Sequence, residues 1–362
     1  DYPSPAYLRE RTVLGNVKAE GEMAEETPGS NLIVKVLLDE TDNRPVWIQA
    51  WGGTNTIARA LKSIEEKYPD RMGEVAKKIR FFFIWEQDST YQSYIRPHWG
   101  KYNILTIISD QFITYFYHWK KYLPVKQQQF LVGKWMNANV IHNHGPLCSL
   151  YKAHENGDFR SEGDSPAYFH VIPTGLRNEE HPDWGGWGGR YVKVRENTWL
   201  DPVEEEGYVY PEGRWYTSNA WGRTRLKKNI PNDQMLIDYL RPTWYCAARA
   251  DWCVKSYDEA NHAPVVVLAH DNINAASSKT VKLNAKGTKD PDGDKLTYKW
   301  WQYREAGSYS GKITLNKIDE IKTSFAVPED AEEGETIHII CEVTDDGIPA
   351  LTRYRRVVVT VM

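Results

Sequence analysis

The sequence has little of what marks small secreted scaffolds. Its four cysteines among 362 residues are too few for a disulfide framework. Cys246 and Cys253 fall in one predicted helix, and their separation places them roughly 10 Å apart, beyond the ~7 Å limit for a disulfide. We therefore expect free, mostly buried thiols.

Long apolar runs and a charge excess of one sign are also missing. No run approaches the roughly 20 residues needed to cross a bilayer, and no leader with a small-residue cleavage site opens the chain. The 45 basic and 49 acidic side chains nearly balance, without a basic stripe or a polybasic tail. These absences argue against a nucleic-acid partner and against a membrane span.

Several catalytic motifs are missing as well. A P-loop, a dinucleotide-binding fingerprint and a nucleophile elbow are all absent. His142 and His144 have the spacing of neither a zinc ribbon nor a helical histidine pair. Aromatic residues are abundant instead, with 15 Trp and 22 Tyr. Such rings pack cores and also stack on the apolar faces of sugars, which favours a carbohydrate-facing protein.

The first two thirds of the chain alternate between helical and strand patterns. The expected helices cover 30–38, 56–67, a segment starting at 91, and 233–257, and the expected strands cover 45–50, 78–84 and 102–108. This alternation predicts a mostly parallel sheet whose ligands bind beyond the carboxyl ends of its strands. The stretch 142–225 has little periodicity, so we expect a long functional loop there.

A period-two pattern begins near Pro264. Strands are expected around 281–285, 296–300, 337–343 and 357–361, separated by the Asp-rich turns 290–294 and 345–349. This is typical of an antiparallel, immunoglobulin-like β-sandwich of about 100 residues. We predict two domains, an α/β domain over 1–260 and a sandwich over 264–362. The carboxylates of 290–294 suit a turn better than a structural calcium site.

Two segments after predicted strands are candidates for binding. Trp51 and Asn55 lie in a glycine-containing turn before a helix, where free backbone N–H groups hold a ligand or simply receive a cap. Gln87 and Asp88 follow the next strand, where polar side chains hydrogen-bond sugar hydroxyls or cap a turn.

Two further segments lie in the aperiodic stretch. Glu162 and Asp164 flank a glycine, an arrangement that suits either a calcium ion or a solvated loop. Trp184 and Trp187 stand among glycines, with Arg190 after them. These residues form either an exposed aromatic surface for sugar or a buried tryptophan pair at the base of the domain.

Taken together, these landmarks resemble one bacterial family, described as cellulose-binding. Its members have a nucleoside-hydrolase-like domain followed by a C-terminal immunoglobulin-like domain. The resemblance covers nearly the whole chain and rests on the segments 51–58, 162–166, 172–176, 181–191, 251–255, 290–294, 300–303, 344–347 and 353–356.

The resemblance implies roles for individual residues. The backbone carbonyl of Trp51 and the carboxylate of Asp164 would help hold calcium, and Gln87 and Asp88 would lie near the sugar hydroxyls. The aspartate-rich first strand of such domains, which supplies the principal calcium ligands and the general base, has no counterpart here. The catalytic base is therefore unknown, and a separate N-terminal fragment or a homo-oligomer is expected to complete the sheet.

Two main functions follow from the resemblance. One is a secreted or periplasmic hydrolase that cleaves a glycosidic or N-glycosidic bond in a polysaccharide or glycoside, using a calcium-held water. The alternative is a non-catalytic protein that binds cellulose or another polysaccharide. A structural subunit with buried tryptophans is a third reading. In each of the first two the partner is carbohydrate.

Overall fold

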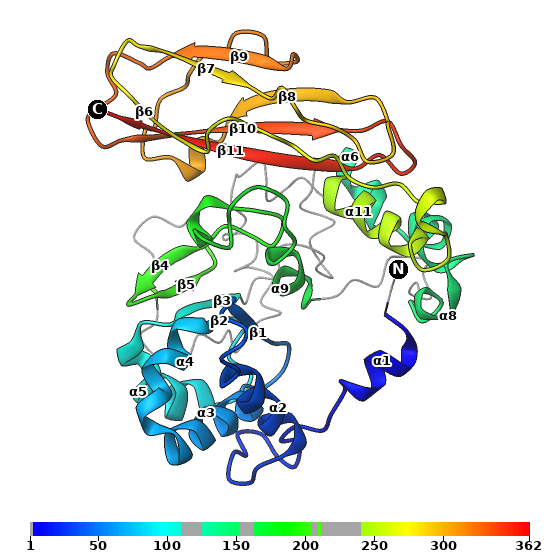
Figure 1. Cartoon of the computed structure of the whole chain (residues 1–362), viewed down its shortest axis with the longest axis vertical. Helices are drawn as coiled ribbons and strands as arrows, with labels where there is room; N and C mark the ends of the chain where they lie inside the picture. The colour runs from blue at the N-terminus through cyan, green and yellow to red at the C-terminus, as the bar shows by residue number, and fades with distance from the viewer. Residues whose placement is uncertain (1–2, 110–124, 152–162, 204–208, 211–239) are drawn as a thin grey trace.

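The computed structural model describes residues 3–109, 125–151, 163–203, 209–210 and 240–362. Figure 1 shows an α/β part, a β-rich C-terminal part above it, and helices α8 and α11 to one side. The helices are α1 (Pro5–Glu10), α2 (Pro28–Leu37), α3 (Asn55–Lys67), α4 (Met72–Lys78), α5 (Arg96–Trp99), α6 (Val125–Gln128), α7 (Gly133–Met136), α8 (Gly145–Cys148), α9 (Ser165–His170) and α11 (Leu240–Asp251).

The α/β part contains one mostly parallel sheet. Its strands are β1 (Val46–Ala50), β2 (Ile79–Ile84), β3 (Leu105–Ser109), β4 (Val192–Arg195) and β5 (Thr198–Leu200). Their order is β1-β2-β3-β5-β4, and all neighbours are parallel except the edge strand β4, which runs antiparallel to β5. The predicted parallel sheet is confirmed.

Strands β4 and β5 lie in the stretch that we expected to be a loop, so that expectation is wrong there. The two strands are only four and three residues long, too short for a period-two pattern to stand out. β5 pairs with β3, and β4 pairs with β5, and neither contact can be recognised in the local sequence.

The phenylalanine run of β2 covers both faces of this sheet. Phe81 and Phe83 pack with the helices α2 to α5 on one face. Phe82 and Ile84 point to the other face, where they meet Tyr191 and α9. Alternation of side chains along a strand explains why an unbroken apolar run is needed for a strand that is buried on both sides.

The C-terminal part is built of two sheets. The strands are β6 (Asn272–Ala275), β7 (Thr280–Asn284), β8 (Thr297–Gln302), β9 (Lys322–Ala326), β10 (Thr336–Thr344) and β11 (Thr352–Val361). One sheet has the order β6-β11-β10-β8, and β7 pairs with β9 in the other. A single apolar core containing Val281, Trp300, Phe325 and Ile339 joins the two sheets.

A separate apolar cluster joins this C-terminal part to the α/β part. Trp187 and Phe169 pack there with Tyr354, Ile340 and Tyr245. Arg356 in β11 is fully buried and donates hydrogen bonds to the carbonyls of residues 176, 184 and 185, at 2.7, 2.8 and 3.0 Å. The junction is therefore packed and hydrogen-bonded like a protein interior.

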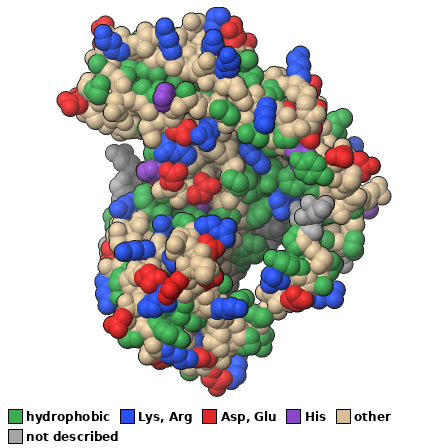
Figure 2. All heavy atoms as spheres, viewed as in Figure 1, with side chains coloured by type: hydrophobic (Ala, Val, Ile, Leu, Met, Phe, Trp, Pro, Cys, Tyr) green, Lys and Arg blue, Asp and Glu red, His purple; other side chains and the backbone are tan. Residues whose placement is uncertain are grey.

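The surface reflects this arrangement. Figure 2 shows the viewed face hollowed between the lobe that carries α2 to α5 and the side that carries α8 and α11, with hydrophobic side chains on its walls. Among the described residues, no helix is long and apolar enough to cross a bilayer.

Candidate functional site

The carboxyl edge of the parallel sheet holds Trp51 in a fixed position. The indole N–H donates to Oε1 of Gln49 at 3.1 Å, and Nε2 of Gln49 donates to the carbonyl of Ala167 at 2.8 Å. The Trp51 carbonyl accepts a hydrogen bond from Nε2 of Gln87 at 3.1 Å. Even so, 52% of Trp51 is exposed. The structure thus brings Trp51 and Gln87 together and presents an oriented indole to solvent.

Asp164 lies near the segment that Gln49 contacts. It is the residue before α9, three positions ahead of Ala167, and its carbonyl accepts a hydrogen bond from the Ala167 N–H at 3.1 Å. Gln49 therefore links Trp51 to the first turn of α9. Glu162 lies outside the described residues.

Asp88 holds the turn that follows β1. Only 2% of this residue is exposed. One carboxylate oxygen accepts the backbone N–H of Asn55 at 3.0 Å, and the other accepts the N–H of Thr90 at 2.8 Å and the hydroxyls of Thr54 and Thr90. Gly53 is required beside it, since a Cβ at that position would collide with the Asp88 carboxylate. The carboxylate thus caps the start of α3.

Asn55 is likewise occupied within the protein. It is 9% exposed, and its Nδ2 donates to the carbonyl of Asn16 at 2.7 Å. The Asn55 and Asp88 side chains therefore have structural contacts in place of the solvent exposure that a sugar ligand requires. Their predicted role in substrate binding stays a prediction.

Other polar groups lie at the strand ends, and two of them, Ser109 and Asp201, escaped the sequence analysis. Ser109 ends β3 and donates to Asp201, which follows β5, at 3.2 Å. Both are 1% exposed. Burial, with the nearby Asp201 carboxylate, raises the pKa of Tyr191 well above its usual value. Glu86, fully buried, accepts from Gln92 at 2.8 Å. Asp201 directly follows the apolar strand β5, and this position could have identified it in the sequence. Because β5 is so short, however, the strand itself was not recognised.

The tryptophan–glycine segment packs against the C-terminal part. Trp187 is 5% exposed and its ring meets Phe169, Tyr245 and Tyr354. Of the two readings given for this segment, Trp187 follows the buried one, because it fills the junction cluster. The predicted contact of Trp187 with substrate stays a prediction.

Trp184 and Arg190 are half-buried. The Trp184 ring stacks on His181 at 3.7 Å between centroids and meets His338 edge-on at 4.9 Å. Gly185 follows with φ +79, and a Cβ there would collide with the Tyr303 hydroxyl. These glycines let the segment approach the C-terminal part closely, which explains their presence without reference to sugar.

The expected calcium ligands are one backbone carbonyl, from Trp51, and one carboxylate, from Asp164. The Trp51 carbonyl already accepts the Gln87 amide. Among the described residues, the acidic and histidine side chains that come close enough for one ion are Asp290, Asp292 and Asp294, in a turn of the C-terminal part. Calcium at Trp51 and Asp164 stays a prediction.

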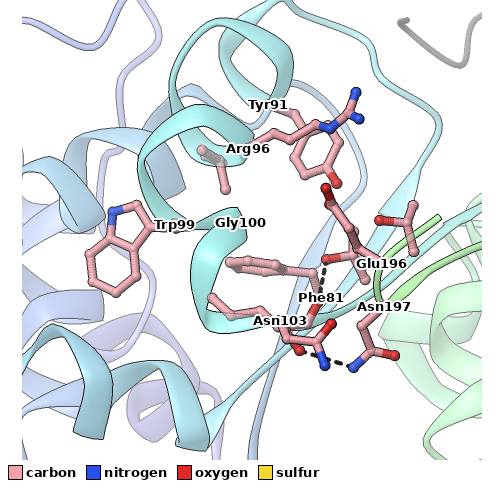
Figure 3. Close-up of a pocket in the computed structure, with 12 residues that line it drawn as sticks. Phe81, Tyr91, Arg96, Trp99, Gly100, Asn103, Glu196 and Asn197 are labelled. Carbon is pink, nitrogen blue, oxygen red and sulfur yellow. Dashed lines mark hydrogen bonds between the residues drawn. The ribbon is translucent and has the colours of Figure 1, made fainter. Parts of the chain in front are cut away.

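Three cavities bordered by described residues do not include Trp51 in their lining. Figure 3 shows one between the α5 segment and the start of β3, lined by Tyr91, Arg96, Trp99, Glu196 and others, where Asn197 donates to the Asn103 carbonyl at 3.0 Å. Its volume of about 20 Å³ fits a water and no sugar. A groove of about 580 Å³ lies at the opposite edge of the sheet, beside Trp47 and Tyr102, and another of about 350 Å³ lies beside Trp252 and Tyr257.

Comparisons with known proteins agree with this architecture. Residues 280–361 match the C-terminal domain of cellulose-binding protein Sde0182. A solved structure from Saccharophagus degradans, a nucleoside hydrolase-related hypothetical protein associated with carbohydrate metabolism, is 29% identical with a TM-score of 0.75 and covers 99% of this chain and 82% of its own. No curated protein matches the chain.

A second solved structure, the PKD domain of KIAA 1837 protein, is 13% identical over 26% of this chain and 85% of its own. Its TM-score of 0.20 is too low to indicate a shared fold. The decisive match is longer. Residues 1–191 match the nucleoside hydrolase-like domain of cellulose-binding Sde182, which is more than half of the chain. The chain therefore belongs to the family of cellulose-binding Sde182 proteins with a nucleoside hydrolase-like domain.

Proposed function

We propose that this protein binds a polysaccharide of the cellulose type at the carboxyl edge of its parallel sheet, with Trp51 as the stacking surface. The observation that carries the proposal is the exposed indole fixed by Gln49, while Gln87 holds the backbone carbonyl of the same residue. Leaving a large apolar ring half in water is unfavourable, and fixing it also costs entropy. A ligand that covers the ring accounts for both.

Sugar rings suit this surface. The C–H groups on one face of a β-linked glucose unit are apolar, whereas its hydroxyls lie around the edge. An indole that is already oriented binds such a face without a further ordering cost. The family's description as cellulose-binding supports glucan as the ligand class.

The binding test uses microcrystalline cellulose and soluble cello-oligosaccharides. Trp51→Ala should weaken binding about tenfold, equivalent to ~1.4 kcal/mol, because the stacking surface is lost. Trp51→Phe should keep part of the affinity. Tyr68→Ala is the matched control, since Tyr68 is 43% exposed and lies at the far end of α3. Wild-type affinity in Trp51→Ala would exclude this surface.

Hydrolysis of a glycosidic or N-glycosidic bond is the second candidate function. It is supported by the buried carboxylates Glu86 and Asp201, which follow β2 and β5 at the edge where this class of sheet carries its active sites. Release of reducing ends from the same ligands, measured with calcium and with a chelator, distinguishes an enzyme from a binding protein. Absence of release under both conditions would leave binding as the function.

We also propose a fold class for the C-terminal part and a cellular location for the protein. We assign the two-sheet part to the immunoglobulin-like class, because two sheets of mostly antiparallel strands enclose one core. A polysaccharide ligand favours a secreted or periplasmic protein. Detection of the protein in fractionated cells tests that location.

A further inference from the structure

We propose that Cys148 and Cys253 form a disulfide when the protein meets an oxidising thiol–disulfide environment. All four cysteines are free in the structure. Cys148 ends α8 and Cys253 follows α11, so the two residues come from segments far apart in the sequence.

The two segments are held against each other by contacts that do not involve sulfur. Nε2 of His144 lies 3.0 Å from a carboxylate oxygen of Asp251. A Cβ at Gly145 would lie 3.2 Å from the side chain of Val254. Both flanks of the cysteine pair are therefore fixed by the fold, and the pair does not depend on a chance encounter of loops.

The thiols themselves are neighbours. Cys148 is 5% exposed, and both sulfurs belong to one apolar cluster with Met136, Val140 and Ala250. A disulfide between them would bring the two sulfurs to the bond length of about 2.05 Å. Cys246 lies within α11, and the rise of this helix over most of the residues that separate it from Cys253 keeps these two thiols apart.

The chemistry is a two-step exchange with a small disulfide such as glutathione disulfide, or with a disulfide-exchange catalyst. Cys253 is the more exposed of the pair, so its thiolate attacks one sulfur of the oxidant and releases one thiol. Cys148 then gives up its proton and attacks the Cys253 sulfur, which releases the second thiol. Two protein thiols lose two electrons and two protons, and one disulfide of the oxidant becomes two thiols.

The order of attack has a physical reason. Burial, with the neighbouring Cys253 thiol, raises the pKa of Cys148 to about 11. Cys148 is therefore a poor first nucleophile at neutral pH, but it reacts readily within the protein once Cys253 carries the mixed disulfide.

The bridge would stabilise more than the two residues. It would join α8 to α11, and α11 contacts the C-terminal part through Arg241, which lies 2.8 Å from the Glu342 carboxylate, and through Tyr245 in the junction cluster. Closing the long loop between the two cysteines restricts the unfolded chain. The expected result is a folded state that resists unfolding better when it is oxidised.

The test equilibrates the native full chain with glutathione disulfide, unfolds it in a denaturant, blocks the remaining thiols with a maleimide, and maps the peptides by mass spectrometry. We expect two labelled thiols, Cys246 and Cys341, one peptide pair linked through Cys148 and Cys253, and a Tm that falls when a reductant is added. Cys246→Ser should form the same link, whereas Cys148→Ser and Cys253→Ser should not.

Two results would overturn the proposal. One is four labelled thiols after equilibration, and the other is a link that involves Cys246 or a second copy of the chain. The wild-type peptide map decides the question even where a serine variant fails to fold.

Discussion

The buried carboxylate of Asp88 provides the sharpest test of how the turn after β1 is held. Replacing Asp88 by alanine leaves two backbone N–H groups, those of Asn55 and Thr90, buried without their acceptor. Each such group costs about 1–3 kcal/mol, and the Asn55 N–H is the group that Asp88 caps at the start of α3. We expect Asp88→Ala to lower the free energy of unfolding by about 4 kcal/mol, a large share of an ordinary domain's stability.

Asp88→Asn keeps the shape of the side chain but removes its negative charge and one of its two acceptor oxygens. The asparagine oxygen can still accept from Thr90, but its NH₂ group then faces the Asn55 N–H across 3.0 Å, where two donors meet. We expect a loss of about 2 kcal/mol, near half that of alanine. The assay is urea unfolding followed by far-UV circular dichroism, with cellulose binding measured on the folded fraction.

The exposed Asp70 supplies the control, because Asp70→Ala should change stability by less than about 0.5 kcal/mol. An Asp88→Ala protein within 1 kcal/mol of wild type would refute the capping argument. Unchanged stability together with a loss of sugar affinity would instead restore Asp88 as a substrate ligand.

Three further predictions concern the junction and buried histidines. Gly175→Ala should cost about 2–4 kcal/mol, because φ is +92 there and a Cβ would collide with the Tyr354 carbonyl; urea unfolding measures it. Arg356→Met should raise hydrogen exchange across the junction, because three carbonyls lose their donor, and should cost about 3 kcal/mol. Burial lowers the pKa values of His170 and His338 to about 3, the latter with help from the Arg356 charge. In the unfolded chain these histidines titrate near pH 6.5, so between about pH 6.5 and 3 the unfolded state binds more protons than the folded state. As the pH is lowered through this range, the free energy of unfolding should therefore decrease by up to about 1.4 kcal/mol per pH unit for each histidine.

Each of these has its own contrary result. Wild-type stability in Gly175→Ala would mean that the backbone around Gly175 and Tyr354 shifts to accommodate the added methyl group without cost. Unchanged exchange in Arg356→Met would mean that the carbonyls find other donors. For the histidines, His170→Gln should show a shallower fall in the urea midpoint from pH 7 to pH 5 than wild type, and an equal fall would contradict a neutral, buried His170.

Local pattern was enough for the elements that bury a regular face. The Phe-rich run of β2, the amphipathic α3, the alternating residues of β10 and the second half of β11 were predicted in place, whereas the first half of β11 was not. Each shows its period within its own length, so no distant contact is needed to recognise it. The residues at strand ends, such as Trp51 and Gln87, could be named for the same reason.

Tertiary contacts decided the rest. Whether Trp187 faced sugar or another domain depended on Tyr354, which lies in β11 at the other end of the chain. The pairing of β5 with β3, and the meeting of Cys148 with Cys253, likewise depend on partners remote in sequence. A glycine-flanked tryptophan or a lone cysteine has the same local pattern in either setting, because burial is a property of the whole packed chain. The sequence alone therefore determined which segments could form strands and helices, and packing alone decided which side chains remained open to a ligand.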